Sequence, residues 1–596
     1  MAQRTSLSNA MRKSLKAVGS KVGLSNGSGK GATYEDLVVL MDEIWQEELK
    51  ASPELATFVG VHDYDAEVSD ISEEAVQAER KMKQAFLDRL MTSFPDSERE
   101  TRAKTWTLDN RVTLGIVKNK LETEIKNIDL KEYLICVHTM GSPHTNWPQI
   151  LPKMKVDTLG DLKTLQSRLS KVSHSLDQYC ERLKVGLAEG VTPPRVSVAG
   201  IPDEIRSMVN GTPNTFHVYI DKVFEEFKGD SEGLHEVLKA LIDDEILPAF
   251  MRFADFLETE YVPNLDENLS VAGRCANGEA LYAHYVKSHT TTDLSPEEIH
   301  QIGLDEVDRI MNTMKEIATS EGFDSVEAYQ EHLDATFFFD TEEKLLNYYK
   351  GVAMNIAPKL PSIIGKLPRT PFGVKAVPSF YGPSAPPAYY EGPPTDLSQA
   401  GFFSLNTYKP ETRKTYISNA LVLHEGCPGH HLQIALATEN GDIHNVRKYA
   451  FYTAYIEGWG LYCEYLGHEM GMYEKPEQHY GRLVIEMMRA CRLVVDTGMN
   501  GTFGWSKEKA MEYMLVNKAG TPGDIDSETT RYVAIPGQAL SYKIGEIKIR
   551  ELRSKCESEL GDKFSIRAFH DLVLGVGAVP LDTLEELVQD WISEQQ

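Results

Sequence analysis

Three histidines and a glutamate lie close together in an otherwise apolar stretch of the sequence. They occupy the run from His424 and Glu425 to His430 and His431, with leucine, valine and alanine on both sides. Two histidines on one face of a helix can bind zinc, and a glutamate next to the first can serve as general base, as in the His-Glu-x-x-His signature. The run therefore predicts a zinc site of the kind that metallopeptidases use.

The spacing departs from that signature, because Pro428 stands four residues after His424, where the second histidine would be. In a straight helix, His430 would lie about 120° from the face of His424, and His431 would return to that face only ~10 Å along the axis. Pro428 leaves the His424 carbonyl without its helical partner, and Gly429 permits unusual backbone angles. We therefore expect a bulge at this Pro-Gly pair that brings His430 to the place of the second ligand, with His431 as the alternative.

A third protein ligand is expected, because catalytic zinc keeps its fourth position for water. Glu457 lies in an aromatic and apolar segment, 451–468, where an unpaired carboxylate is costly unless a metal offsets the cost. Glu464, two helical turns later, is the runner-up ligand, although we expect it to lie on a solvated face. The alternative without a metal is that His430 and His431 cap a broken helix while Glu457 pairs with an arginine.

The elements that must position these residues are mostly helices. Long helical patterns joined by short polar turns predict one large, mainly α-helical body. Apolar residues recur at helical spacing in 34–49, 74–92, 160–187, 218–262, 297–319 and 341–356. Residues 188–214 contain four prolines and an Asn-Gly pair and are expected to form a loop.

Residues 358–398 are rich in proline and aromatic residues, and no helix persists through so many prolines. We expect extended segments and a small β element just before the motif, where a strand would pair with the backbone of a peptide substrate. An irregular connector that covers the core fits the composition equally well. The body is accordingly divided into a helical N-terminal part, 34–357, and a zinc-binding catalytic part, 358–596, within one continuous domain.

Composition limits the function classes. Of the 596 residues, 41% are hydrophobic, so a large core can form, and the net charge of -27 argues against nucleic acid as a partner. Seven scattered cysteines without a C-x-x-C pair indicate free thiols in a reducing compartment, which predicts a cytoplasmic protein. No apolar run reaches the ~18 residues of a transmembrane helix.

Residues 1–33 contain several lysines and arginines but no acidic residue. A basic, flexible tail is the expectation for this segment. Its apolar residues also follow a helical spacing, as in a mitochondrial transit peptide or a membrane-surface helix, so a mitochondrial location is the alternative. These apolar residues are Leu7, Met11, Leu15, Val18 and Val22.

Several segments resemble the DUF885 family, whose motif is His-Glu-x-x-Pro-Gly-His, commonly followed by His-Leu-Gln. The motif stands here at 424–433, and similar segments lie at 455–462, 488–498 and 536–545. The resemblance implies a mostly helical, zincin-like protein similar to gluzincin metallopeptidases. It also implies that His424, His430 and Glu457 hold one Zn²⁺ per chain, since the residue at position 431 varies between relatives.

The resemblance extends to residues outside the motif. Asp496 is expected to accept a hydrogen bond from a ligand histidine. Tyr542 is the first choice for the donor that meets the developing oxyanion, with Arg531 and Tyr532 as substrate-binding residues. Relatives usually carry histidine where this chain has Asn500, which puts full activity in question.

Together these features predict a hydrolase of peptide bonds, acting on short peptides through a zinc-bound water that Glu425 activates. The alternatives are a zinc hydrolase of another amide or ester, and a binding protein with weakened catalysis, for which Asn500 is the only hint. The presence of Glu425 argues against the binding protein, and the lack of a Gly-x-Ser-x-Gly elbow argues against a serine hydrolase. Peptide preference and oligomeric state have no signature in the sequence.

Overall fold

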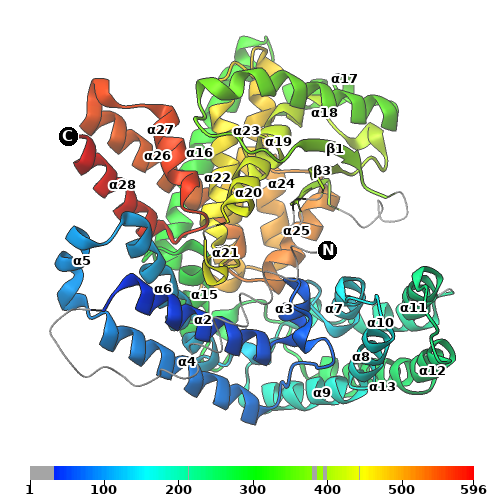
Figure 1. Cartoon of the computed structure of the whole chain (residues 1–596). Coiled ribbons are helices and arrows are strands. Elements are labelled where there is room, and N and C mark those ends of the chain that lie inside the picture. The colour runs from blue at the N-terminus through cyan, green and yellow to red at the C-terminus, as the bar shows by residue number, and fades with distance from the viewer. Residues whose placement is uncertain (1–31, 213, 379–385, 394–396, 398, 442) are drawn as a thin grey trace.

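The computed structural model describes residues 32–212, 214–378, 386–393, 397, 399–441 and 443–596. The chain is mainly α-helical with one small β-sheet, as the sequence predicts (Figure 1). The basic segment 1–31, on which the choice between a flexible tail and a transit peptide rests, lies outside the described residues. Within the described ranges, no helix has both the length and the apolar content needed to cross a membrane.

The first part of the chain forms helices that begin at polar caps. Thr33 and Asp36 form a reciprocal capping box at the start of the first described helix, and Ser295 and Glu298 form another at the start of a later one. In Figure 1 these helices, coloured blue to green, make up the lower part of the molecule and extend into its upper part. They are α2 (Tyr34–Ala51), α3 (Pro53–Phe58), α4 (Glu73–Ser93), α5 (Arg99–Thr105), α6 (Leu108–Asp129), α7 (Pro143–Ile150), α8 (Leu159–Leu169), α9 (Val172–Glu189), α10 (Ile201–Asn210), α11 (Thr215–Glu226), α12 (Leu234–Leu241), α13 (Leu247–Phe256), α14 (Val271–Arg274), α15 (Gly278–Thr290), α16 (Pro296–Ser320), α17 (Val326–Thr336) and α18 (Glu342–Ile356).

Two predictions for this part are wrong in detail. The expected loop at 188–214 contains α10, whose first turn includes Pro202. Proline is tolerated in the first turn of a helix because its missing N–H would have no partner there, so Pro202 begins a helix instead of preventing one. The stretch 218–262 is not one continuous helix, since α11 ends at Glu226 and α12 begins after Gly233, which has the left-handed backbone angle φ +75°.

Three short strands precede the motif: β1 (Phe372–Ala376), β2 (Ala388–Glu391) and β3 (Gly401–Leu405). Their order in the sheet is β1-β3-β2, with β1 parallel and β2 antiparallel to the central β3. Phe403 and Leu405 of β3 are buried in the largest core cluster. The predicted small β element is therefore present and joins the core directly before the motif.

The remaining helices follow the sheet and carry most of the candidate site. They are α19 (Ser418–Glu425), α20 (His430–Glu439), α21 (Asn445–Lys448), α22 (Thr453–Leu466), α23 (Pro476–Asn500), α24 (Lys507–Val516), α25 (Pro522–Ala534), α26 (Ser541–Leu560), α27 (Ile566–Gly575) and α28 (Leu581–Gln595). The same core cluster contains residues from Val112 to Ile592, so the two predicted parts of the body share one core. All seven cysteines lie in the described ranges and are free, as expected.

Helices α22 and α26 cross at two glycines. A Cβ atom on Gly545 would lie 1.9 Å from the carbonyl oxygen of Ala454, and one on Gly458 would lie 2.5 Å from the Gly545 backbone. Real Cβ atoms do not approach so closely, so the two helices can touch only because both residues lack a side chain. This crossing brings the start of α26 next to the middle of α22.

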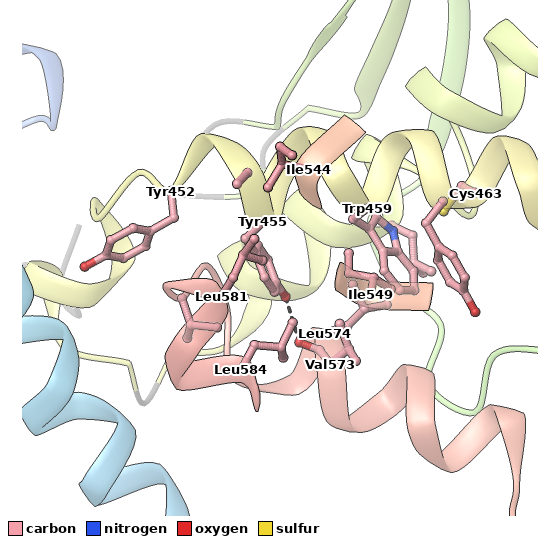
Figure 2. Close-up of a cluster of buried hydrophobic side chains, with 14 of the residues drawn as sticks. Tyr452, Tyr455, Trp459, Cys463, Ile544, Ile549, Val573, Leu574, Leu581 and Leu584 are labelled. Atoms are coloured by element: carbon pink, nitrogen blue, oxygen red, sulfur yellow. Dashed lines mark hydrogen bonds between the residues drawn. The ribbon is translucent and has the colours of Figure 1, made fainter. Parts of the chain in front are cut away.

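An adjacent face of α22 anchors the pair in the core. Tyr455 and Trp459 pack there with apolar residues of α26, α27 and α28 (Figure 2). The Tyr455 hydroxyl donates a 2.7 Å hydrogen bond to the Val573 carbonyl oxygen, drawn as a dashed line in the figure. The buried aromatic face thus fixes the rotation of α22 and leaves its other face to the motif.

Candidate metal centre

The motif is divided between two helices. α19 ends at Glu425 and α20 begins at His430, so the predicted bulge is in fact a complete interruption of four residues. Gly426 and Gly429 have ψ angles of -135° and -131°, which belong to neither helix nor strand, and a Cβ on Gly429 would lie 1.9 Å from the His424 carbonyl oxygen. The interruption allows His430 to approach His424 in a way that a straight helix forbids.

Three side chains converge across this break. The Nε2 atoms of His424 and His430 lie 3.4 and 3.3 Å from Oε2 of Glu457 on α22. Zinc binds such atoms at about 2.0–2.2 Å in a tetrahedral arrangement, which places neighbouring ligand atoms about 3.3–3.5 Å apart. The spacing of the donors, and their identity as two imidazoles and one carboxylate, therefore fit a zinc ion.

The ring of His424 lies across one stripe of α22. Its Nε2 faces Glu457, and its Nδ1 donates a 2.8 Å hydrogen bond to Oε1 of Glu464. Positions 457, 460 and 464 lie within about 60° of one another around the helix. Gly460 is between the two glutamates, and a Cβ there would lie 2.8 Å from Cε1 and Nε2 of the His424 ring.

The expectation that Glu464 lies on a solvated face is wrong, since this residue is completely buried. A carboxylate accepts hydrogen bonds only, so Glu464 holds the proton on Nδ1 and leaves Nε2 of His424, which faces Glu457, as the atom that could bind a metal. Glu464 thus occupies the position behind a ligand histidine that a supporting carboxylate takes in zinc sites.

The charges of His424, His430 and Glu457 favour a cation at the centre of this group. Burial lowers the pKa of His424, but hydrogen bonds to Glu457 and Glu464 outweigh this and raise it to about 9. Burial raises the pKa of Glu457, but its two histidine partners outweigh this and hold it well below the ordinary value. The centre thus favours positive charge beside the Glu457 carboxylate, a requirement that a bound proton or a metal ion would satisfy.

His431, the alternative ligand, faces away from this centre. Its Nδ1 lies 2.9 Å from the Tyr390 hydroxyl of β2, and its ring packs against Phe372 of β1. Burial lowers its pKa to about 4, so the ring is neutral at physiological pH. His431 thus joins the motif to the sheet, while His430 belongs to the group that could hold a metal ion.

Tyr542 lies next to the centre, at the start of α26. Its ring stacks on that of His424 with the two centroids 6.4 Å apart. Within the described residues, neither the Tyr542 hydroxyl nor the Glu425 carboxylate has a hydrogen-bond or ion-pair partner. Both groups are partly exposed, so each remains available to a substrate.

Tyr532 and Arg531 differ from the prediction. Tyr532 is completely buried, with its hydroxyl donating to Glu528 and accepting from Nε of Arg492, so it does not contact a substrate directly. Arg531 is partly exposed and is paired with Glu528 at 2.9 Å and with Gln538. Tyr532 therefore supports the arginines, and only Arg531 can reach a ligand.

Asp496 does not contact a ligand histidine, so the role predicted for it is wrong. Its carboxylate accepts from the Tyr282 hydroxyl at 2.8 Å, from the Gly537 N–H at 3.0 Å and from Nδ2 of Asn500 at 3.3 Å. Asn500 also donates to the Tyr532 carbonyl oxygen and is completely buried. Both residues thus hold the turn that precedes α26, and the supporting carboxylate is Glu464 instead.

Comparison with known proteins identifies the family and the fold. A family model described as "Bacterial protein of unknown function (DUF885)" matches residues 53–588. The chain belongs to the DUF885 family. No curated protein matches it.

Two solved structures share the fold of this DUF885 protein. A candidate lipoprotein from Colwellia psychrerythraea is 25% identical, with a TM-score of 0.84 over 94% of this chain and 100% of the other. A candidate lipoprotein of unknown function from Shewanella oneidensis is 15% identical, with a TM-score of 0.73 over the same shares. The second likeness concerns the fold alone.

The burial of Glu464 in the DUF885 site was mispredicted although a signal for it existed. Glu464 lies in the same apolar helix as Glu457 and seven residues later, so the argument from the cost of burying a carboxylate applied to both. Gly460 and the arginines of α23 gave no such signal, because their importance comes from contacts with distant segments. These contacts are the His424 ring for Gly460 and the Tyr542 ring for Arg492.

Proposed function

We propose that this DUF885 protein is a zinc-dependent hydrolase that cleaves peptide bonds, with short peptides as substrates. The supporting observation is the convergence of His424, His430 and Glu457, with Glu464 behind His424 and an unpaired glutamate next to it. Glu425 is that glutamate, and a binding protein would have no use for it.

A zinc ion bound by this group would lower the pKa of a water molecule towards ~7 and polarise a substrate carbonyl. Glu425 directly follows His424 and closes α19, so its unpaired carboxylate can accept a proton from that water and pass it to the leaving nitrogen. The free hydroxyl of Tyr542 can donate to the carbonyl oxygen as negative charge develops there.

The proposal is tested by metal analysis together with digestion of a peptide library. The purified chain should contain about one zinc ion and should cleave library peptides, and a chelator should abolish cleavage. His430→Ala should lose the metal. Glu425→Gln should keep the metal and lose at least ~100-fold in rate.

Two outcomes would contradict the proposal. A chain that contains zinc but cleaves no peptide in the library would favour another amide or ester as substrate, or a binding role. Full activity of Glu425→Gln would mean that another group takes the proton from water.

A further inference from the structure

Two arginines lie over the face of Tyr542, and a third arginine lies beside them. The guanidinium carbons of Arg492 and Arg489, both on α23, lie 4.2 and 5.6 Å from the centre of the Tyr542 ring. Arg531 of α25 joins this group through Glu528, whose Oε2 atom lies within ion-pair distance of both Arg531 and Arg492. Two positive charges therefore lie over the aromatic ring that stacks on His424, and the charge of Arg531 lies next to them.

The three arginines carry more positive charge than the single neighbouring carboxylate, Glu528, can balance. Glu528 is the shared partner of Arg492 at 2.6 Å and Arg531 at 2.9 Å. Among the described residues, Arg489 has no carboxylate within ion-pair distance, and its guanidinium donates a hydrogen bond to the Met488 sulfur. The cluster thus carries an excess of about two positive charges, in a chain whose net charge is -27.

The cluster also has unused donors in a buried setting. Arg492 is only 5% exposed, yet its Nη1 has no hydrogen-bond partner, and Nε of Arg489 is buried without a partner too. An unpaired guanidinium donor is costly away from water, so this arrangement is suited to an anion that arrives from outside. Arg489, Arg531 and Tyr542 are partly exposed, which leaves a route for such an anion.

The distance between the arginines and the candidate metal centre indicates what kind of anion would bind. The contacts of Tyr542 with His424 and with Arg492 place the Arg492 guanidinium within roughly 11 Å of the His424 ring, the length of about three extended residues. A planar carboxylate matches the fork of a guanidinium. The free C-terminus of a short peptide would thus reach the arginines while a bond one to three residues away lies at the metal.

We propose that Arg489, Arg492 and Arg531 form a subsite for a substrate carboxylate, so that the protein recognises the free C-terminal end of peptides. The cleavage of such peptides rests on the proposed function, whereas their binding at this subsite does not. An acidic side chain near the C-terminus offers the same chemistry and is the other source of the carboxylate.

Binding to the full-length, metal-free chain tests the subsite without relying on hydrolysis. The probes are acetyl-tetraalanine as free acid, the same peptide as C-terminal amide, and an amide whose last residue is glutamate. We expect calorimetry to show at least ~10-fold tighter binding of the free acid than of the alanine amide. Arg489→Gln should reduce this ratio to below about 3-fold, because Arg489 supplies the donors without an ion-pair partner, and Arg489→Lys should restore part of it.

Arg99→Gln is the matched control, since Arg99 is exposed and pairs with Glu586 on a distant surface. It should keep the wild-type ratio, and circular dichroism should show that all three variants are folded. Tighter binding of the glutamate amide alone would support the carboxylate subsite and assign it to an acidic side chain. Equal binding of all three probes to the wild type would overturn it.

Hydrolysis by the zinc-loaded chain separates this inference from the proposed function. Cleavage of the free acid and the alanine amide at equal rates would overturn the subsite and leave the peptidase intact. Selective binding of the free acid without any cleavage would support the subsite and contradict the peptidase.

Discussion

At the scale of single residues, the site depends on carboxylates placed where water is scarce. Glu457 was predicted from the cost of burying its charge in an apolar helix, and the structure places it between two histidines. Glu464 lies in the same apolar helix, two turns later. The sequence alone does not tell whether its face of the helix is buried or solvated, because that depends on which segment packs against it. That segment carries His424, and the interaction spans 40 residues.

We expect Glu464→Gln to weaken zinc binding by about 10- to 100-fold, because amide oxygen still accepts from Nδ1 of His424 but no longer carries a charge. Competition with a chromogenic chelator would measure the affinity. Glu474→Gln, in the exposed turn after α22, is the control and should bind zinc as the wild type does. Unchanged affinity in Glu464→Gln would show that this carboxylate only fills space.

A second prediction concerns Asp496 and pH. Burial raises its pKa to about 7 against an ordinary 3.8, so the folded protein keeps a proton that the unfolded chain releases. Because the folded state binds more protons, this residue makes the free energy of unfolding fall as pH rises from about 4 to about 7. Asparagine stays neutral, so the free energy of unfolding of Asp496→Asn should not show this fall. Urea denaturation should therefore show the difference between variant and wild type shift in favour of the variant as pH rises across this range. Parallel curves would contradict the prediction.

At the scale of elements, two close backbone approaches shape the site. The interruption between α19 and α20 turns His430 towards His424, and the glycine crossing of α22 and α26 brings Tyr542 beside them. The first could be anticipated, because proline and glycine stand where a helix would otherwise continue. The second could not be anticipated, since the sequence does not show that the helices containing Gly458 and Gly545 pack against each other.

Gly545→Ala should therefore destabilise the protein and disturb the site together. A methyl group 1.9 Å from the Ala454 oxygen forces the helices apart, at a cost above the ~1–3 kcal/mol of ordinary overpacking. Thermal unfolding and zinc content would measure both effects. Gly351→Ala on α18, where no atom lies within 4 Å of the added carbon, should instead stabilise the protein by about 0.5–1 kcal/mol.

At the scale of the whole molecule, segments far apart in sequence support the site from behind. Tyr282 on α15 binds Asp496, and Lys543, the neighbour of Tyr542, is completely buried among Glu306 of α16, Glu486 of α23 and Glu546 of α26. Helical content and the ligand candidates could be predicted because they depend on local patterns. This polar network could not, because each member looks like an ordinary surface residue in its own helix.

Lys543→Met should cost up to about 3 kcal/mol of stability, because the carboxylates of three helices lose their shared buried cation and keep only Arg309, Arg482 and Arg550 as partners. Chemical denaturation would measure the loss. Lys548→Met, one turn further along α26, removes a partly exposed ion pair with Glu585 and should cost no more than about 1 kcal/mol. Equal effects of the two substitutions would show that the buried network adds no stability beyond that of a surface pair.

The bare backbone at Gly460 offers a way to sort uncharacterised family members. The His424 ring lies where a side chain at this position would be, so any larger residue would push the ring away from both glutamates. A relative could thus carry the full His-Glu-x-x-Pro-Gly-His motif and still have no room for the ligand geometry. A search for the motif together with the Glu-Gly-x-Gly segment of α22 would therefore separate two kinds of sequence. One kind can form this centre, and the other has the motif but lacks the glycine that makes room for the histidine ring.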